Sequence, residues 1–287
     1  MITAEHEEVR CGAGAGFVDS VSLEFSHPEA SLFGLARMTR RPSSERAHGR
    51  LLLFRSGALV EQLELEQHGE IDWRDANIDG IRLRTEAPLE RWSLEAGGAE
   101  SSMRLEARAS TPARSLADEI AQAVGIERYE QVCEVEGEVT TGERTQTVHC
   151  RGRRVHAWGN PDPESSSRWR SLFAVTAAGR AISAAAALPP TSPGHDRELR
   201  YARWLDADDA PPFEEVRVST VYDINGSPTK AGLELWMPGD ELPRRLGGAA
   251  VCGTRIERDD QVIALSFFRW SIDDEPAYGS YEIIERQ

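Results

Sequence analysis

The sequence contains no hydrophobic run of the length that a membrane-spanning helix needs, about 20 residues. Its longest apolar stretch, residues 181–188, is rich in alanine and is followed by Pro189 and Pro190. The first ten residues, MITAEHEEVR, are acidic, whereas a signal peptide begins with basic residues and continues with an apolar segment. We therefore expect a cytoplasmic protein that does not insert stably into membranes.

Basic residues are few relative to acidic ones. There are 33 Lys and Arg residues against 48 Asp and Glu residues, which gives a formal net charge of −15. Proteins that bind nucleic acids place clustered basic side chains against phosphates. We therefore expect no nucleic-acid partner, and we interpret the excess of acid as a feature that favours solubility.

The motifs that bind metals and cofactors are also missing. The cysteines form no C-x-x-C pair, and the histidines do not have the spacing of metal ligands. No phosphate-binding loop, G-x-G-x-x-G turn or G-x-S-x-G elbow stands between a predicted strand and a helix. We expect no metal and no cofactor. The four cysteines are Cys11, Cys133, Cys150 and Cys252.

Short segments in which apolar and polar residues alternate are abundant. Residues 18–25 (VDSVSLEF) and 59–66 (LVEQLELE) show the pattern clearly, and turn residues separate such segments. Many short strands at this spacing predict an antiparallel sandwich or barrel. The other predicted strands are residues 49–53, 81–85, 92–96, 103–109, 129–140, 145–158, 169–175, 198–205, 216–224, 232–237, 261–272 and 278–284.

One segment interrupts the strand pattern. Leu116, Ile120 and Val124 repeat at helical spacing, Ser115 can cap the helix, and Gly125 can end it. We expect this helix to join two β-domains, so that the fold is mostly β. The predicted division is an N-terminal β-domain (1–112), a helical linker (113–127) and a C-terminal β-domain (128–287).

Residues 129–159 hold most of the chemically interesting side chains. Folded as a hairpin about Thr141 and Gly142, they place Cys133 opposite Cys150. Because side chains alternate between the two faces of a strand, one face is largely apolar and should point inward. Its members are Tyr129, Gln131, Cys133, Val135, Val139, Val148, Cys150, Gly152, Arg154, His156 and Trp158.

Arg154, His156 and Trp158 on an inward face require an explanation, because a buried charge is costly unless it is paired. Two explanations remain open. In the first, Arg154 pairs with a buried carboxylate, while His156 and Trp158 donate to backbone carbonyls. In the second, His156 and Trp158 line a ligand cavity, where the indole can face a polyene or a carbocation.

Further candidates lie near the end of the sequence. Glu234 and Glu282 alternate with apolar neighbours, so either could pair with Arg154, act as an acid of raised pKa, or be an exposed strand residue. Trp236, Trp270 and Tyr281 suit a cavity wall and a hydrophobic core equally well. The alternation of apolar and polar residues alone does not show which of these roles each side chain has.

The hairpin segment resembles a known signature. Carotenoid 1,2-hydratases and AttH-like proteins carry R-D-H-S-W-G after a strand of the form Y-E-Q-x-x-x-V-x-G-x-V, and residues 154–159 (RVHAWG) and 129–139 follow this pattern. Residues 86–92 (EAPLERW) and 278–282 (YGSYE) are similar to two weaker segments of that family, in the same order. The chain is therefore identified as similar to the AttH and carotenoid hydratase family.

The resemblance implies two lipocalin-like antiparallel β-barrel or sandwich domains with a cavity for an apolar, isoprenoid- or polyketide-like molecule. Relatives include hydratases and decalin-forming Diels–Alderases, which implies cofactor-independent cyclisation, isomerisation or hydration. In the hydratases the signature His and Trp are functional, which implies catalytic roles for His156 and Trp158, with Glu282 or Glu234 as the acid. The expected substrate-binding residues are Arg154, Tyr129, Trp236, Trp270 and Tyr281.

Two departures from the family pattern affect this expectation. Val155 and Ala157 replace the acidic and hydroxyl residues of the signature. Residues 181–185 (AISAA) occupy the region where the hydratases have a Tyr-x-Asp pair. The proton donor of a carotenoid hydratase is therefore not visible. A non-catalytic carrier of a hydrophobic ligand is the alternative.

Overall fold

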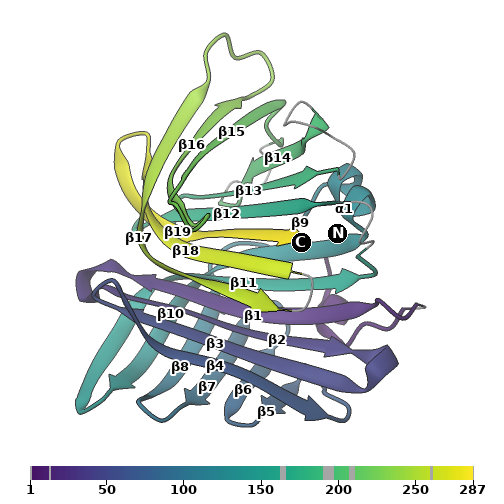
Figure 1. Ribbon diagram of the computed structural model, residues 1–287. Coiled ribbons are helices and arrows are strands. Elements are labelled where there is room, and N and C mark those ends of the chain that lie inside the picture. The colour runs from purple at the N-terminus through teal and green to yellow at the C-terminus, as the bar shows by residue number, and fades with distance from the viewer. Residues whose placement is uncertain are drawn as a thin grey trace. The chain divides into compact units, whose positions relative to one another are not determined.

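The computed structural model describes residues 2–12, 14–161, 166–189, 197–206, 211–258 and 261–286. The chain divides into two compact units, and each is built around one antiparallel sheet (Figure 1). None of the helices in these ranges is both long enough and apolar enough to span a bilayer. The first unit comprises Met1–Leu116 and Gly125–Pro161, and the second comprises Ala117–Val124 and Asp162–Gln287.

The sheet of the first unit has 11 described strands, in the order β4-β3-β2-β1-β11-β10-β8-β7-β6-β5, with β9 paired to β10. Its edge strands β4 and β5 contact one another, so the sheet curls into a barrel. The strands are β1 (Val18–His27), β2 (Leu32–Arg41), β3 (Arg46–Arg55), β4 (Ala58–His68), β5 (Asp75–Ile78), β6 (Ile81–Ala87), β7 (Arg91–Gly97), β8 (Ser101–Ala109), β9 (Arg114–Ser115), β10 (Ile126–Thr141) and β11 (Arg144–Gly159).

The alternation seen in the sequence explains how these strands bury one face. In β1 the apolar members Val21, Leu23 and Phe25 lie in the barrel core. The sequence pattern missed β2, because nearly all of its first seven residues are buried and a strand covered on both faces does not alternate. It also missed the four-residue strand β5, which is too short to show a period.

In the described residues, the sheet of the second unit has eight strands, in the order β14-β13-β12-β19-β18-β17-β16-β15. The edge strands β14 and β15 contact one another, so this sheet also curls. Its core is a separate apolar cluster that includes Leu172, Phe268 and Tyr281. The strands are β12 (Arg168–Thr176), β13 (Ala181–Leu188), β14 (Leu199–Trp204), β15 (Glu215–Tyr222), β16 (Pro228–Trp236), β17 (Arg244–Arg258), β18 (Gln261–Ile272) and β19 (Glu275–Arg286).

Two strands of the second sheet were not predicted. The strand β17 contains three glycines and a register shift between Ala250 and Cys252, so its apolar residues do not keep a single period. The strand β13 reads AISAAAAL and is buried on both faces, so it also lacks alternation. The predicted mostly-β fold with two barrel-like domains is confirmed.

Helix α1 spans Asp118–Val124 and ends where Gly125 adopts a φ of 68°. The predicted cap at Ser115 is wrong, because Ser115 belongs to β9 and pairs with Tyr129 of β10. Outside the strands there are one-turn 3₁₀ helices: η1 (Ala4–Glu7), η2 (Pro28–Ala30) and η3 (Pro42–Ser44).

The hairpin β10–β11 belongs to the first sheet, where β11 pairs with β1 and β10 with β8. The predicted division puts this hairpin in the C-terminal domain, whereas in the structure it belongs to the first unit. The reason is that β1, at the start of the chain, supplies the partner strand. Sequence order alone does not reveal such a non-local pairing.

The hairpin register differs from the predicted one by two residues. Thr141 pairs with Arg144, and Cys133 lies opposite Gly152 and not opposite Cys150. An offset of two leaves every side chain on its predicted face, since the side-chain period of a strand is two. Both cysteines are free thiols, and burial raises the pKa of each to about 12.

Candidate functional site

The inner face of the hairpin is buried, as its alternation predicts. Tyr129, Arg154 and His156 have no exposed surface, and Trp158 is 9% exposed. These four side chains gather at the end of the first sheet where β1 begins and β11 ends. They form the centre of a buried polar cluster that we treat as the candidate site.

His156 is held by a carboxylate from the neighbouring strand β1. Its Nε2 lies 2.7 Å from Asp19 Oδ1. The other carboxylate oxygen, Oδ2, accepts hydrogen bonds from Trp73 Nε1 and from the Arg10 backbone N–H, both at 2.8 Å. Because a carboxylate only accepts, the proton of this contact belongs to Nε2, and Nδ1 is left as an acceptor.

Tyr129 connects His156 to a second carboxylate. The Tyr129 hydroxyl donates to Glu7 Oε1 at 2.7 Å, and its oxygen lies 3.4 Å from His156 Nδ1. A hydroxyl has one proton, so donation to Glu7 leaves Nδ1 without a short hydrogen bond from Tyr129. The Asp19–His156–Tyr129 series is therefore a buried row of titratable groups in which His156 Nδ1 is the proton acceptor.

Arg154 pairs with the same carboxylate. Its Nη2 lies 3.2 Å from Glu7 Oε2, which also accepts from Trp92 Nε1 at 3.3 Å. Arg154 Nη1 donates to the carbonyl oxygen of Val155. Glu234 and Glu282 were the predicted partners of Arg154. The carboxylate in contact with it is Glu7 instead, in the one-turn helix η1.

Aromatic rings surround the imidazole. The centroid of the His156 ring lies 5.1 Å from that of Trp158, 5.6 Å from Tyr129 and 6.3 Å from Trp73. The guanidinium of Arg10 stands over the Trp158 ring at 4.8 Å from its centroid. Trp158 and His156 are thus in ring contact. The first of the two explanations from the sequence had His156 donate to a backbone carbonyl, but the imidazole is held by the carboxylate of Asp19.

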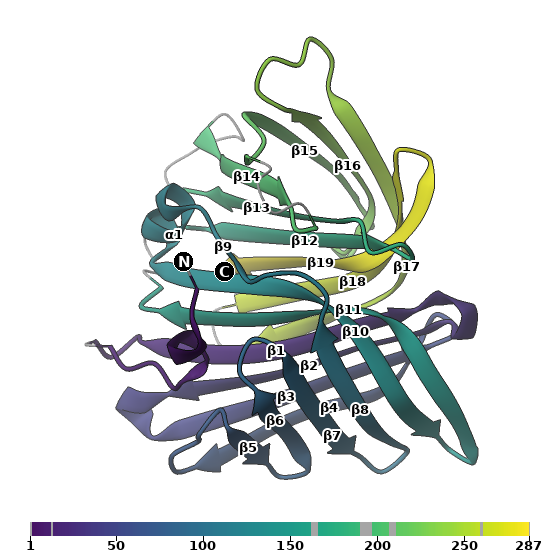
Figure 2. The same ribbon diagram turned by 180° about the vertical axis from the view of Figure 1, so that it is seen from behind.

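The N-terminal segment covers this end of the sheet. In Figure 2 it is the dark purple chain that contains η1 and lies beside the strands of the first sheet. Glu7 is the only buried residue of η1. Ile2 packs against the cluster of Phe17, Tyr129 and Trp158. The segment therefore inserts one carboxylate into the site and leaves the rest of its turn at the surface.

Burial perturbs both titratable groups in the chain. It lowers the pKa of His156 below its usual 6.5, although the hydrogen bond to Asp19 acts in the opposite direction. It raises the pKa of the Tyr129 phenol well above 10, and Arg154 opposes this increase. At neutral pH His156 is therefore a neutral base and Tyr129 a neutral donor.

We expect His156 to make the protein less stable in acid. Its pKa is lower in the folded state than in the unfolded chain, so the unfolded state binds more protons as the pH falls through about 6.5. The free energy of unfolding should thus fall between about pH 7.5 and 5, and this slope should be smaller in His156→Gln. Urea denaturation across this range measures it.

The matched control for that slope is His149→Gln, because the His149 side chain is 77% exposed. This control should keep the slope of the unmodified protein. Equal slopes in His156→Gln and the unmodified protein would show that the imidazole is not held neutral by the fold.

The remaining predicted site residues lie in the second unit. Glu234 and Trp236 stand on the strand face opposite the core residues Leu233 and Leu235. Glu234 is 37% exposed and forms an ion pair with Arg245 at 3.1 Å. It is therefore a surface residue on β16, and the structure does not bring it to His156.

Three further predicted residues occupy neighbouring strands of the second sheet. Trp270 and Tyr281 belong to the apolar core, where their ring centroids are 6.5 Å apart. Glu282 is buried, but as the next residue along β19 it faces the opposite side from Tyr281. Trp270 and Tyr281 thus line the interior of the second sheet, and Glu282 does not.

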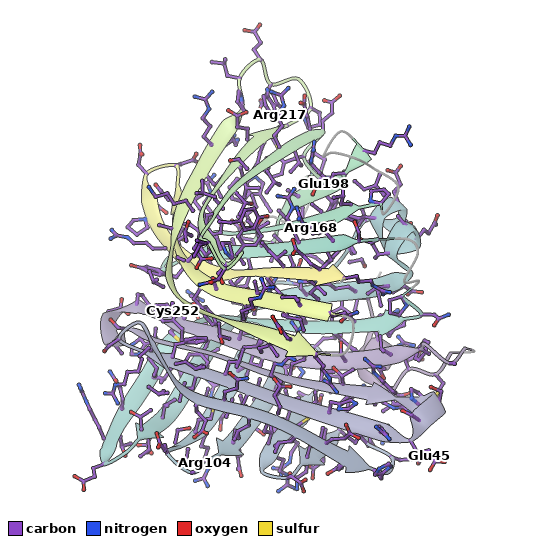
Figure 3. All side chains as sticks on the ribbon, viewed as in Figure 1. Glu45, Arg104, Arg168, Glu198, Arg217 and Cys252 are labelled. Carbon is purple, nitrogen blue, oxygen red and sulfur yellow. The ribbon has the colours of Figure 1, made fainter. Side chains whose placement is uncertain are left out.

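Tyr281 takes part in a second buried polar group. Its hydroxyl lies 2.6 Å from Thr220 Oγ1, which accepts from Arg170 Nη1 at 3.4 Å. Arg170 also binds both carboxylate oxygens of Glu198, labelled in Figure 3. Burial raises the pKa of Tyr281, with Arg170 opposing it. Because Arg170 is neutralised by Glu198, this group has the character of a structural ion pair.

An open depression of about 520 Å³ lies elsewhere on the first unit. Its two arginines are paired, since Arg82 bonds Asp75 and Arg104 lies 3.6 Å from Glu95. Paired charges at an open rim do not suit an apolar ligand. The lining residues are Asn77, Gly80, Arg82, Glu95, Ala96, Gly97, Ser102, Met103, Arg104, Glu138 and Thr140.

Several members of the site, among them Asp19 and Glu7, were not predicted from the sequence. Asp19 had a usable signal, because it shares the inward face of residues 18–25 with Val21, Leu23 and Phe25. Glu7 had none, because it lies outside any periodic segment. Within the described residues, no group of three or more His, Cys, Asp or Glu side chains is arranged to hold a metal ion.

Three solved structures have the same architecture. A putative AttH from Nitrosomonas europaea is 14% identical and aligns over 93% of this chain and 91% of that protein, with a TM-score of 0.67. Kievitone hydratase from Nectria haematococca is 16% identical over 94% and 89%, with a TM-score of 0.66. CghA is 10% identical over 95% and 88%, with a TM-score of 0.68.

The sheets and these neighbours define a two-domain, lipocalin-like β-fold that this chain shares with the AttH structure, which confirms the predicted resemblance at the level of fold. The chain belongs to the family described as "Domain of unknown function (DUF7064)", whose model matches residues 4–287. No curated protein matches the sequence.

Proposed function

We propose that the first unit binds an apolar, isoprenoid- or polyketide-like small molecule beside His156 and promotes a cofactor-independent isomerisation, cyclisation or hydration of it. The observation that carries this proposal is the buried series Asp19–His156–Tyr129 with aromatic rings around the imidazole. A titratable chain of this kind, enclosed by apolar walls and with a shifted pKa, is the usual setting of acid–base catalysis.

Each member of the chain has a distinct role in this proposal. Asp19 fixes the tautomer and orientation of His156, so that Nδ1 presents its lone pair. Tyr129 stays a neutral donor, because burial raises its pKa, and it can stabilise oxygen that gains charge. Trp158 offers an aromatic face to a polyene or a cation.

Isomerisation is the reaction that a neutral imidazole serves best. His156 Nδ1 removes a proton from carbon, and the electron pair of the broken C–H bond shifts the adjacent double bond. The imidazolium exchanges this proton with solvent and then delivers one proton to a different carbon, which regenerates the neutral imidazole. The substrate and product have the same atoms, and no oxidant or water is consumed. Protonation of an isolated alkene for hydration needs a stronger acid, and the lowered pKa of His156 leaves little imidazolium at neutral pH.

One of the structural neighbours is named a hydratase, which supports keeping hydration among the candidate reactions. The second candidate function is a carrier of a hydrophobic ligand. The stretch AISAA at residues 181–185, in place of the Tyr-x-Asp pair of the hydratases, favours the carrier. The site residues would then bind without turning over their ligand.

Incubation in D2O with a β,γ-unsaturated isoprenoid ketone tests the proposal. We expect the conjugated isomer to form and to carry deuterium from solvent. His156→Gln should reduce the rate about 100-fold, because it removes the group that transfers the proton. Mass spectrometry and ultraviolet absorbance follow the reaction.

Two results would count against catalysis in this test. The first is a ketone that binds but is not converted, which favours the carrier. The second is an isomerisation rate that His156→Gln leaves unchanged. The exposed substitution His149→Gln is the control, and it should leave the rate as it is.

A further inference from the structure

The carboxylate of Glu7 occupies a binding site that is built entirely by the barrel. Its oxygens accept from the hydroxyl of Tyr129, from Arg154 Nη2 and from Trp92 Nε1. These donors come from β10, β11 and β7, and all three side chains are fully buried. The helix η1 therefore supplies only the acceptor, and the three hydrogen-bond donors belong to strands of the barrel.

Glu7 uses only part of the hydrogen-bonding capacity of this site. Arg154 Nε is buried and has no partner in the part of the chain that the structure describes. The same holds for Oε1 of Gln131, the residue that pairs with Arg154 across the strands. A free carboxylate can bind an arginine through Nε and Nη2 together, whereas Glu7 contacts Nη2 alone.

Glu7 is also the member of this ion pair that can leave. It lies on the single turn Ala4–Glu7, in which Glu5 is exposed, so its charge can move into water when residues 2–8 detach. Arg154 lies in β11, paired on both sides by β1 and β10, and has no comparable exit. The site is thus a fixed cation with a detachable anion.

We propose that Arg154, Tyr129 and Trp92 bind the carboxylate of an apolar acid, and that Glu7 occupies this subsite until such an acid displaces it. This inference rests on the proposed function and names the substrate class of the same site: an apolar chain that ends in a carboxylate. The single proton of the Tyr129 hydroxyl passes from Glu7 to the carboxylate of the bound acid, so His156 Nδ1, 3.4 Å away, keeps its lone pair.

Chemical rescue with acetate tests the carboxylate subsite. Glu7→Ala removes the built-in anion and leaves space for a small carboxylate. We expect acetate to raise the Tm of Glu7→Ala by about 3–6 °C relative to chloride at the same ionic strength, as expected for a ligand at roughly ten times its Kd. The unmodified protein should show no such difference.

Three variants control for a general salt effect. Glu5→Ala changes an exposed residue of the same turn and should not be rescued. Glu7→Gln fills the space with a neutral group and should not be rescued either. Glu7→Ala combined with Arg154→Met removes the cation and should abolish the rescue. If Glu7→Ala does not fold in chloride, recovery of folded protein by acetate serves as the same readout.

Decanoate and decanol distinguish this inference from the proposed function. In calorimetric titrations Glu7→Ala should bind decanoate about tenfold more tightly than the unmodified protein does, since no displacement is needed, and decanol should bind both equally. Equal gains for acid and alcohol, or no rescue by acetate, would overturn the carboxylate subsite while leaving turnover of the ketone untouched. Selectivity for decanoate without any turnover would support the subsite in a carrier.

Discussion

Replacing Glu7 with alanine is expected to lower the free energy of unfolding of the first unit by about 3–5 kcal/mol, and replacing Arg154 with methionine by only about 1 kcal/mol. The two residues form one ion pair at 3.2 Å, with 3% and 0% of their side chains exposed. If only the lost contact mattered, the two substitutions would lower the free energy of unfolding by the same amount. The expected difference comes from what the remaining partner can do.

After Glu7→Ala the guanidinium of Arg154 stays within the barrel with no anion to neutralise it. Its neighbours Gln131 and Trp92 offer an amide oxygen and an aromatic face, and the face lies 5.6 Å from the guanidinium carbon. Neither replaces a carboxylate in a medium of low polarity. After Arg154→Met, Glu7 can move to the surface with its turn, so no unpaired charge remains buried.

Hydrogen exchange of the amides in β1, β10 and β11 measures this difference without interference from the second unit. Protection there should fall far more in Glu7→Ala than in Arg154→Met, and Glu5→Ala should change nothing. Equal losses in the two variants would mean that Arg154 reaches water or another anion, and would remove the argument that the cation is fixed.

The sequence was enough to predict which side chains of the hairpin point inward, because this depends only on whether two residues are an even or an odd number of positions apart. Tyr129, Arg154, His156 and Trp158 are separated by even numbers of positions along their strands or across the ladder. The error of two residues in the register therefore moved no side chain to the other face. The pairing of Cys133 with Cys150, in contrast, depended on the exact register and was wrong.

The carboxylates of the site could not be predicted in the same way. Asp19 reaches His156 only because β1 pairs with β11, and the two residues are 137 positions apart in sequence. Glu7 lies in a one-turn helix without periodicity, 147 positions from Arg154. Val155, which stands where the R-D-H-S-W-G signature has an acid, faces away from the imidazole. The carboxylate beside His156 therefore comes from another strand.

The last residue of the RVHAWG segment has a backbone role that leads to the second large effect. Gly159 adopts a φ of 148°, a region that side chains rarely allow. A Cβ at this position would overlap the carbonyl oxygen of Gly125 and lie 3.0 Å from the Cα of Ile126. Both are backbone atoms at the start of β10, so neither can move aside without shifting the strand.

Gly159→Ala should therefore lower the free energy of unfolding of the first unit by about 3–5 kcal/mol, from backbone strain together with the overlap. Gly69→Ala is the matched control, because Gly69 has a φ of 122° but nothing within 4 Å of the added carbon. Strain alone should cost about 1–3 kcal/mol there.

Denaturation of the two variants, followed by hydrogen exchange in β10 and β11, separates strain from overlap. Gly159→Ala should also increase the fluorescence of Trp158. Trp158 precedes the strained backbone of residue 159, so its indole should move away from the neighbouring groups that quench it. Equal decreases in the free energy of unfolding for Gly159→Ala and Gly69→Ala would show that the backbone around Gly125 and Gly159 can shift to accommodate a Cβ. The close approach of β11 to the start of β10 would then not be what positions the indole and the imidazole.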